Sequence, residues 1–204
     1  MVERLKGRYH VSWFEESGDD YPVRVFILKD QATISLDTSG VPLHKRGYRK
    51  LVSEAPIRET LAAALLMLTP WNKDRILVDP FCGSGTFLIE AAMMGKRIAP
   101  GINRSFEAEN WSFVRVNMVC RCDEAGDMVI DHLEMDLQGY DKNPQMLRIA
   151  RENARDAEVD DLIHFQQREV KDLRHSKAYG FVIANPPYGE RLEDRKDLPE
   201  LTAR

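Results

Sequence analysis

The chain has 204 residues, of which 43% are hydrophobic, and a formal net charge of −4. This length and apolar content allow one sizeable core, while the negative balance argues against a broadly basic nucleic-acid binder, so contact with nucleic acid should be local. The sequence lacks an apolar run long enough to span a bilayer, and its first residues lack the apolar stretch of a secretory signal. Its three cysteines, Cys82, Cys120 and Cys122, lack paired metal-ligand spacing. We therefore expect a cytoplasmic protein with reduced thiols and no metal.

Residues 1–40 predict a β-hairpin. Residues 21–28 are rich in β-branched and aromatic side chains, Lys29 and Asp30 are typical of a turn, and residues 32–36 alternate between apolar and polar. Two strands rarely hold together alone, so we expect this piece to belong to a larger unit or to pack against the main domain.

Residues 41–70 combine a basic stretch with a helix. Glu54 is the one acid between residues 41 and 58, where the cations are Lys45, Arg46, Arg49, Lys50 and Arg58. This stretch is either a solvated linker or a surface that contacts phosphate groups. Ser53 and Pro56 are typical of a helix start. The helix should end near Thr69 and cover the sheet through an apolar stripe of Ile57, Leu61, Leu65 and Leu68.

Residues 71–204 are predicted to form the main domain, organised around the stretch 75–90. A short apolar run ends at Asp79, and Gly83 and Gly85 then lead into a run of helix-forming residues. This pattern predicts a strand, a tight turn and a helix start, the place where open α/β sheets bind nucleotide-like ligands.

This turn fits one nucleotide-like ligand better than others. Leu88 occupies the position of the third glycine in the dinucleotide fingerprint, and the lysine of a phosphate-binding P-loop is absent. S-adenosylmethionine has no phosphate and needs room beside glycine backbone and an acid for its ribose, so we favour it. A glycine turn between a strand and a helix is also ordinary structure. The helix is predicted to run from Thr86 to Met94 and to be stopped by Gly95.

Three further strands are predicted to complete the sheet, at residues 137–141, 163–167 and 180–184. The last of them reads as a fully buried strand. Asn143 and Pro144 are typical of the cap and first residue of a helix that continues to Ala157. After the third strand, either Glu169 or Asp172 is placed to reach an adenine amino group.

Asp141 closes the second strand, where an acid can hold a ribose diol by paired hydrogen bonds. Its distance from Asp79 is 62 residues (141 − 79), far beyond the roughly 20 of a plain unit. The segment between them must then be an insertion outside the sheet, within which residues 106–122 suggest a helix carrying Trp111. The competing interpretation of Asp141 is a turn aspartate.

The tetrapeptide Asn185-Pro186-Pro187-Tyr188, at the carboxyl end of the fourth strand, is the most specific signal. Two prolines fix the backbone and remove two donors, so the Asn185 side-chain oxygen and the Pro186 carbonyl can accept from one external donor. An exocyclic amine of a nucleobase is such a donor, and Tyr188 offers a flat face on which an extruded base can stack. A rigid turn would explain the tetrapeptide alone, but its combination with the glycine turn favours a methyltransferase.

Residues 79–92, 99–104 and 185–192, together with Trp111, resemble the class I RNA methyltransferases that carry a THUMP domain. The specific resemblance is to the RlmL/YcbY-type large-subunit rRNA guanine-N2 methyltransferases, which are also labelled N6-adenine-specific DNA methylases. Residues 37–49 are similar to the junction between the THUMP and catalytic domains of that family. The resemblance implies an α/β, Rossmann-like class I fold, with a mostly parallel sheet flanked by helices.

The resemblance also implies two sets of site residues. The cofactor, S-adenosylmethionine, would be bound by Asp79, Phe81, Gly83, Ser84, Gly85, Thr86, Asp141 and either Glu169 or Asp172. Within this set Asp141 would hold the ribose. The target base would be bound by the catalytic residues Asn185, Pro186, Pro187 and Tyr188.

The expected function is S-adenosylmethionine-dependent methylation of guanine N2 in large-subunit rRNA. Adenine-N6 methylation of DNA and a non-catalytic RNA-binding fragment are the alternatives. Residues 1–40 would be the end of a THUMP-like segment, residues 41–70 a basic linker and covering helix, and residues 71–204 the catalytic domain. Because the family continues beyond both ends of this match, we expect a truncated sheet whose exposed edge promotes self-association.

Overall fold

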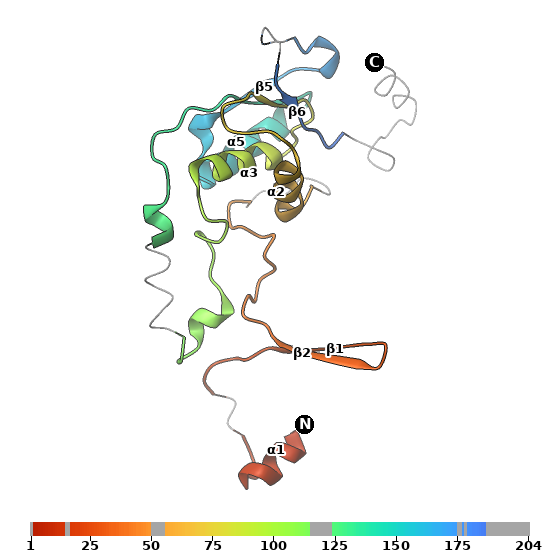
Figure 1. Cartoon of the computed structure of the whole chain (residues 1–204), viewed down its shortest axis with the longest axis vertical. Coiled ribbons are helices and arrows are strands. Elements are labelled where there is room, and N and C mark those ends of the chain that lie inside the picture. The colour runs from red at the N-terminus through yellow and green to blue at the C-terminus, as the bar shows by residue number, and fades with distance from the viewer. Residues whose placement is uncertain are drawn as a thin grey trace. The chain divides into compact units, whose positions relative to one another are not determined.

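A computed structural model describes residues 2–14, 17–49, 56–114, 124–174, 177 and 179–186 (Figure 1). The chain divides into two compact units. The first comprises Met1–Val41 and Phe106–Val119, and the second comprises Pro42–Ser105 and Cys120–Arg204. In the described parts of both units, every helix is too short or too polar to cross a membrane.

The first unit contains helix α1 (Val2–Tyr9) and the antiparallel hairpin of β1 (Val23–Leu28) and β2 (Gln31–Leu36). The predicted hairpin is therefore confirmed. Its turn residues, Lys29 and Asp30, have φ values of 49° and 61°, the left-handed pair that matches the twist of two-residue hairpins. Every residue of both strands is exposed in this structure, including the apolar ones.

Residues 106–114 join the first unit instead of forming the predicted long helix. A short 3₁₀ helix, η1 (Glu107–Asn110), ends before Trp111. The indole N–H of Trp111 donates to the Asp20 carbonyl at 2.7 Å, and its ring lies 5.2 Å from that of Tyr21. These contacts with a distant part of the chain replace the next helical turn, so the prediction is wrong for the described residues. Residues 115–122 of the predicted helix lie outside them.

The second unit is built on a parallel sheet with the strand order β5-β4-β3-β6. The strands are β3 (Leu77–Asp79), β4 (Leu137–Asp141), β5 (Ile163–Gln167) and β6 (Phe181–Val182). All four strands lie at the predicted positions. Strand β3 pairs directly with β4, so the long segment between them lies outside the sheet. Because the strands are parallel, the segments that follow them share one edge.

Strand β6 corrects one prediction. Phe181 is half-buried and Val182 is 70% exposed, so this strand is not fully buried. Within the described residues its one sheet neighbour is β3, which makes it an edge strand. Self-association through this edge stays a prediction.

The helices α2 (Glu59–Leu68), α3 (Thr86–Lys96) and α5 (Pro144–Asp156) belong to the same unit (Figure 1). Helix α3 contacts β3, β4 and β5, helix α5 contacts β4 and β5, and α2 packs on α3. The main core lies among these elements and includes Leu66, Leu77, Leu88, Ile89, Leu137, Leu147 and Phe165. A smaller cluster consists of Ile76, Val78 and Tyr140, with Leu173 against it. These observations establish a Rossmann-like α/β fold.

Helix α2 buries a different face from the predicted stripe. Leu61, Leu65 and Leu68 are all exposed, while Ala62 and Leu66 are buried. Ala62 and Leu66 belong to the main core and α2 packs on α3, so this is the face that α2 buries. The helix begins at Glu59, and Ser53, the expected cap, lies outside the described residues.

The end of α3 and the start of α5 can be compared with the predicted stop at Gly95 and the predicted cap at Asn143. Helix α3 continues through Gly95 to Lys96, so the predicted stop at Gly95 is wrong. A Cβ on Gly95 would lie 2.5 Å from the Met135 sulfur, so the glycine makes room for a neighbour instead. The cap of α5 is confirmed, because the Asn143 side chain accepts from the Gln145 N–H at 2.9 Å.

The missing third glycine at Leu88 has a structural counterpart. A Cβ on Gly139, in the adjacent strand β4, would lie 2.7 Å from Leu88 Cδ1. The close approach of helix to strand that a helix glycine provides in dinucleotide-binding folds is therefore provided here by a strand glycine.

Candidate functional site

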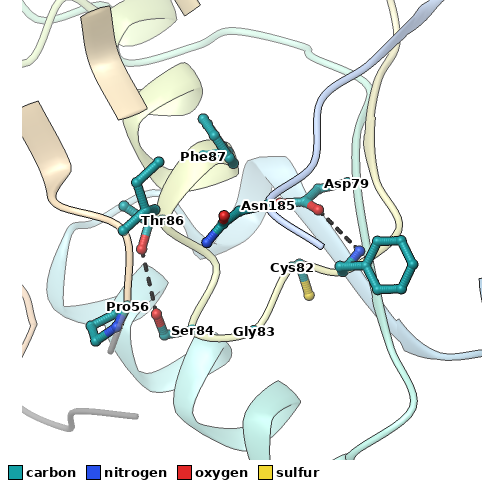
Figure 2. Close-up of a pocket in the computed structure, with 10 residues that line it drawn as sticks. Pro56, Asp79, Cys82, Gly83, Ser84, Thr86, Phe87 and Asn185 are labelled. Carbon is teal, nitrogen blue, oxygen red and sulfur yellow. Dashed lines mark hydrogen bonds between the residues drawn. The ribbon is translucent and has the colours of Figure 1, made fainter. Parts of the chain in front are cut away.

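A cavity of about 70 Å³ lies at the carboxyl edge of the sheet in the second unit (Figure 2). Its lining residues are Pro56, Ile57, Asp79, Phe81, Cys82, Gly83, Ser84, Thr86, Phe87 and Asn185. The structure thus brings Asn185, after β6, to the same cavity as the glycine turn after β3, and Figure 2 shows it between Thr86 and Asp79. Two motifs that are far apart in the sequence meet, as their positions after parallel strands predict.

The glycine turn is held by backbone hydrogen bonds. The Cys82 N–H donates to the Tyr140 carbonyl at 2.9 Å, and the Gly85 N–H donates to the Cys82 carbonyl at 2.7 Å. Gly83 and Gly85 have φ values of 51° and 83°, which favour glycine at both positions.

The two glycines differ in what surrounds them. A Cβ on Gly85 would lie 3.2 Å from Ala150 Cβ and 3.1 Å from the Phe165 ring, whereas a Cβ on Gly83 would meet nothing within 4 Å. Gly85 therefore serves both conformation and packing. Gly83 leaves an open approach to the backbone, as a bound ligand would require.

Asn153 also supports the turn, and the sequence analysis missed it. Its side-chain amide is buried and donates to the Ser84 carbonyl at 3.2 Å. Asn153 shares the buried face of α5 with Leu147 and Ala150. A polar residue at helical spacing on an apolar face was the available signal, because a buried amide needs a partner.

Asp79 is almost fully buried beside the turn. Its Oδ1 accepts from the Phe81 N–H at 3.0 Å. Burial raises the pKa of Asp79 to about 7, with a smaller contribution from the charge of Asp141, while the Phe81 N–H acts in the opposite direction. The cavity therefore contains a carboxyl group that changes charge near neutral pH.

Asp141 is half-buried and accepts two backbone hydrogen bonds. Its Oδ1 accepts from the Asn143 N–H at 2.8 Å, and its Oδ2 accepts from the Gly83 N–H at 3.0 Å. It is therefore a turn aspartate, as one interpretation held. Each carboxylate oxygen has two lone pairs, so one on each oxygen remains for the two hydroxyls of a ribose. Both interpretations of Asp141 are compatible.

Glu169 and Asp172 lie after β5 in an exposed position, and neither lines the cavity. Glu169 forms an ion pair with Lys171 at 2.7 Å, and the hydrogen bond from Lys171 lowers the pKa of Glu169. That one of these two acids contacts an adenine stays a prediction.

Cys82 lines the cavity as a buried free thiol. Burial raises its pKa well above the ordinary value, and the carboxyl groups of Asp79 and Asp141 act in the same direction. It is therefore a neutral packing residue of the turn at physiological pH. Across the part of the chain that the structure describes, no cluster of three or more His, Cys, Asp or Glu side chains is arranged to hold a metal ion.

The basic stretch is neither a solvated linker nor a phosphate-contacting surface at its two central arginines. Arg46 donates to both oxygens of Glu90 at 3.2 and 3.1 Å, and the Tyr48 hydroxyl donates to Glu90 at 3.0 Å. Arg49 lies 3.5 Å from Glu59. The side chains of all four charged residues are at most 11% exposed. Two buried acids on helices α2 and α3 explain the two arginines.

Of the predicted target-binding residues, the structure describes Asn185, which is half-buried, and Pro186, which is exposed. Pro187 and Tyr188 lie outside the described residues. The arrangement as a whole joins an open glycine turn, a pair of acids and an amide at one sheet edge, which is the composition expected of a nucleotide-cofactor site with an adjoining substrate site.

Comparison with known proteins defines the family. Residues 46–204 match the UPF0020 family, described as RMKL-like, methyltransferase domain. The chain therefore belongs to this family and carries a methyltransferase domain, a class of enzyme domain that takes its methyl group from S-adenosylmethionine.

Individual relatives agree with this assignment. The chain is 45% identical over 205 residues to "Putative RNA methyltransferase YpsC" of Bacillus subtilis (strain 168), covering 98% of this chain and 53% of that protein. It is 39% identical over 193 residues to "Ribosomal RNA large subunit methyltransferase K/L" of Vibrio parahaemolyticus, covering 89% of this chain and 27% of that protein. The chain thus spans about half of the first relative's length and about a quarter of the second's.

A solved structure also matches the fold. The crystal structure of SMU.472, described as "a putative methyltransferase complexed with SAH", has 43% sequence identity and a TM-score of 0.89. The match covers 98% of this chain and 53% of that one.

Proposed function

We propose that this chain carries the catalytic domain of an RNA methyltransferase that uses S-adenosylmethionine to methylate the exocyclic N2 amine of guanine in large-subunit rRNA. The single observation that carries the proposal is the meeting of Asn185 with Asp79 and Gly83 at one cavity. The family match and the names of the relatives support the choice of RNA, and in particular of ribosomal RNA, as the substrate.

The cofactor site proposed here consists of residues whose geometry fits S-adenosylmethionine. Asp141 retains one lone pair on each oxygen for the ribose hydroxyls, and Gly83 has an open side. Asp79 lines the same cavity and accepts hydrogen bonds best when ionised, so we expect affinity to rise as the pH passes upward through about 7. Bound there, the cofactor supplies an electrophilic methyl group whose sulfonium is already a good leaving group.

The protein's own contribution is to position the amine. The Asn185 side-chain oxygen and the Pro186 carbonyl are proposed to accept both hydrogens of the exocyclic amine. This would return the nitrogen lone pair from the ring to the amine and aim it at the methyl group. Positioning of this kind supplies most of the catalysis when no strong base is required. Tyr188 is proposed to stack on the extruded base, a contact typically worth about 1–3 kcal/mol.

The parts outside this site are proposed to serve substrate binding and location. Residues 1–40 are proposed to be the end of a THUMP-like segment that docks RNA. An enzyme acting on ribosomal RNA would work in the cytoplasm.

A transfer assay tests the proposal. The purified chain is incubated with methyl-labelled S-adenosylmethionine and either rRNA or duplex DNA, and the labelled nucleoside is identified. We expect N2-methylguanine in RNA. Label that appears as N6-methyladenine in DNA alone would favour the DNA methyltransferase instead. RNA binding without S-adenosylhomocysteine binding in calorimetry would favour a non-catalytic RNA-binding protein.

Two variants separate the proposed roles. Asn185→Ala should abolish transfer while leaving the affinity for S-adenosylhomocysteine unchanged, since the amide is assigned to the target base. Asp141→Ala should weaken S-adenosylhomocysteine binding. Transfer that survives in Asn185→Ala would contradict the role given to that amide.

A further inference from the structure

The side chain of Arg49 contacts two walls of the cavity without lining it. Its Nη2 donates to the Thr86 hydroxyl at 2.6 Å and to the Ile57 carbonyl at 3.1 Å. Thr86 and Ile57 both line the cavity, and Thr86 directly follows Gly85 at the start of α3. Arg49 thus joins the segment before α2 to the residue that ends the glycine turn.

Arg49 is held in place from its other side. Its Nε lies 3.5 Å from Glu59 Oε1, and the two side chains are 11% and 4% exposed. Burying a carboxylate and a guanidinium costs less free energy when the two groups face one another. Glu59 therefore restrains the position from which Arg49 reaches Thr86.

The contact also determines whether the Thr86 hydroxyl acts as a hydrogen-bond donor or acceptor toward Arg49. A guanidinium has donors and no acceptor, so the Thr86 oxygen must accept from Arg49. The hydroxyl hydrogen remains free to be donated, and Ser84 Oγ lies 3.4 Å away. Without Arg49, the hydroxyl would be free to rotate and bond to the local backbone.

We infer that Arg49 is a positioning residue of the cofactor site, acting through the Thr86 hydroxyl and the Ile57 backbone. The identity of the ligand rests on the proposed function. Arg49 itself does not line the cavity, and it sets the geometry of two residues that do. Arg49 thereby contributes to the cofactor site through a buried contact, although the composition of residues 41–58 predicted a solvated linker or a phosphate-contacting surface.

Calorimetric titration of the full chain with S-adenosylhomocysteine tests this inference. Arg49→Gln and Thr86→Val should each raise the Kd roughly tenfold, the lower end of what loss of a charge-assisted hydrogen bond produces. Because Arg49 acts partly through Thr86, the double variant should lose less affinity than the sum of the two single losses. Additive losses, or an unchanged Kd in Arg49→Gln, would overturn the inference.

Arg46→Gln is the matched control. It breaks a comparable buried pair on the same segment, because Arg46 donates to both oxygens of Glu90, and Glu90 does not line the cavity. Its Kd should stay within about twofold of the parent, the range expected of an uncoupled site. Equal losses in Arg46→Gln and Arg49→Gln would mean a general loss of stability, which would contradict a positioning role.

A ligand-free measurement keeps the inference separate from the proposed function. Amide hydrogen exchange at residues 84–87 should be faster in Arg49→Gln than in Arg46→Gln, because Arg49 donates to Thr86 at the end of the turn whereas Arg46 donates to Glu90. Equal exchange in the two variants would contradict the inference, whether or not the parent chain binds S-adenosylhomocysteine. Failure of the parent chain to bind S-adenosylhomocysteine would instead refute the proposed cofactor.

Arg49→Lys is the alternative if Arg49→Gln does not fold. It keeps a cation but loses the planar fork whose Nε faces Glu59 while its Nη2 donates to Thr86 and Ile57. We expect near-parental stability with the weakened Kd. A parental Kd in Arg49→Lys would show that charge alone suffices and that the two hydrogen bonds do not position the site.

Discussion

Residues 42–49 and the β1–β2 hairpin reverse what their compositions suggest. The first stretch is dense in cations, yet Arg46, Tyr48 and Arg49 are buried or nearly so. The hairpin is rich in valine, isoleucine and phenylalanine, yet all of its strand residues are exposed in this structure. Composition describes what a segment can bury, whereas burial is decided by what the fold places opposite it.

For residues 42–49 the opposing groups are known. Glu59 and Glu90 lie on buried helix faces, and each needs a cation nearby because an unpaired buried carboxylate is costly. For the hairpin, the described residues offer no apolar layer that covers either face. The stability of the protein should therefore be sensitive to changes in the charged stretch and insensitive to changes in the apolar one.

The largest expected effect is that of Arg46→Met. It leaves Glu90 buried without its cation, which should lower the free energy of unfolding by about 3–5 kcal/mol. Arg24→Met is the control, since it breaks an ion pair with Asp37 in which Arg24 is 73% exposed, and such surface pairs contribute about 0–1 kcal/mol. Urea unfolding followed by circular dichroism measures both. Similar losses in the two variants would remove the contrast between the regions.

The same variant should show a particular pH dependence. Burial raises the pKa of Glu90, whereas Arg46 and Tyr48 lower it, so removing Arg46 should raise that pKa further. A group whose folded pKa lies above its unfolded value costs stability as the pH rises through the interval between the two. The deficit of Arg46→Met should therefore be larger at pH 8 than at pH 5. A deficit independent of pH would mean that Glu90 is not the group affected.

Gly47→Ala should have the next largest effect. Gly47 has a φ of 100°, and a Cβ would lie 2.7 Å from the Asn103 carbonyl oxygen, which is backbone and has little freedom to move. Backbone strain and overpacking together should cost about 3 kcal/mol. Gly18→Ala, at a φ of 109° in open space, isolates the strain and should cost about 1 kcal/mol. The difference between their urea midpoints measures the contact.

Tyr48→Phe should have a moderate effect. It removes the hydroxyl that donates to the buried Glu90 at 3.0 Å, and hydrogen bonds to charged groups contribute about 1.5–3 kcal/mol. Tyr21→Phe, whose exposed hydroxyl donates to Asp19 at 3.1 Å, should change the free energy of unfolding by less than about 0.5 kcal/mol. Thermal unfolding of both variants at one pH makes the comparison.

The smallest expected effect is that of Ile27→Thr in the hairpin. Ile27 is 70% exposed, and substitutions at such sites usually stay within about 0.5 kcal/mol. The threonine keeps the β-branched shape, so strand preference changes little. A loss above about 1.5 kcal/mol, the range of a buried side chain, would show that the hairpin is covered in solution and would break the contrast.

Features set by local sequence were predictable. The positions of the strands, the hairpin turn at Lys29 and Asp30 and the Asn143 cap each depend on a few neighbouring residues. The meeting of Asn185 with the glycine turn also followed, because the carboxyl ends of parallel strands share one edge of the sheet.

Features set by distant partners were not predictable in the same way. The Arg46–Glu90 and Asn153–Ser84 contacts join residues 44 and 69 positions apart, and neither segment alone specifies the other. The buried face of α2 was missed for the same reason, because a helix with apolar residues at several spacings turns toward whichever neighbour it meets. The sequence indicated such partners only through acids and amides at positions on the apolar faces of helices, since these groups need a partner when buried.

The bonds around Cys82–Gly85 have a consequence for how a ligand would be received. With Tyr140, Asp141 and Asn153 each bonded to this short segment, its backbone has little freedom left to lose. A molecule that docks there would meet a surface already in its final shape, and little of its interaction energy would go into ordering the protein. Association should then be fast and insensitive to temperature-induced loosening elsewhere in the chain.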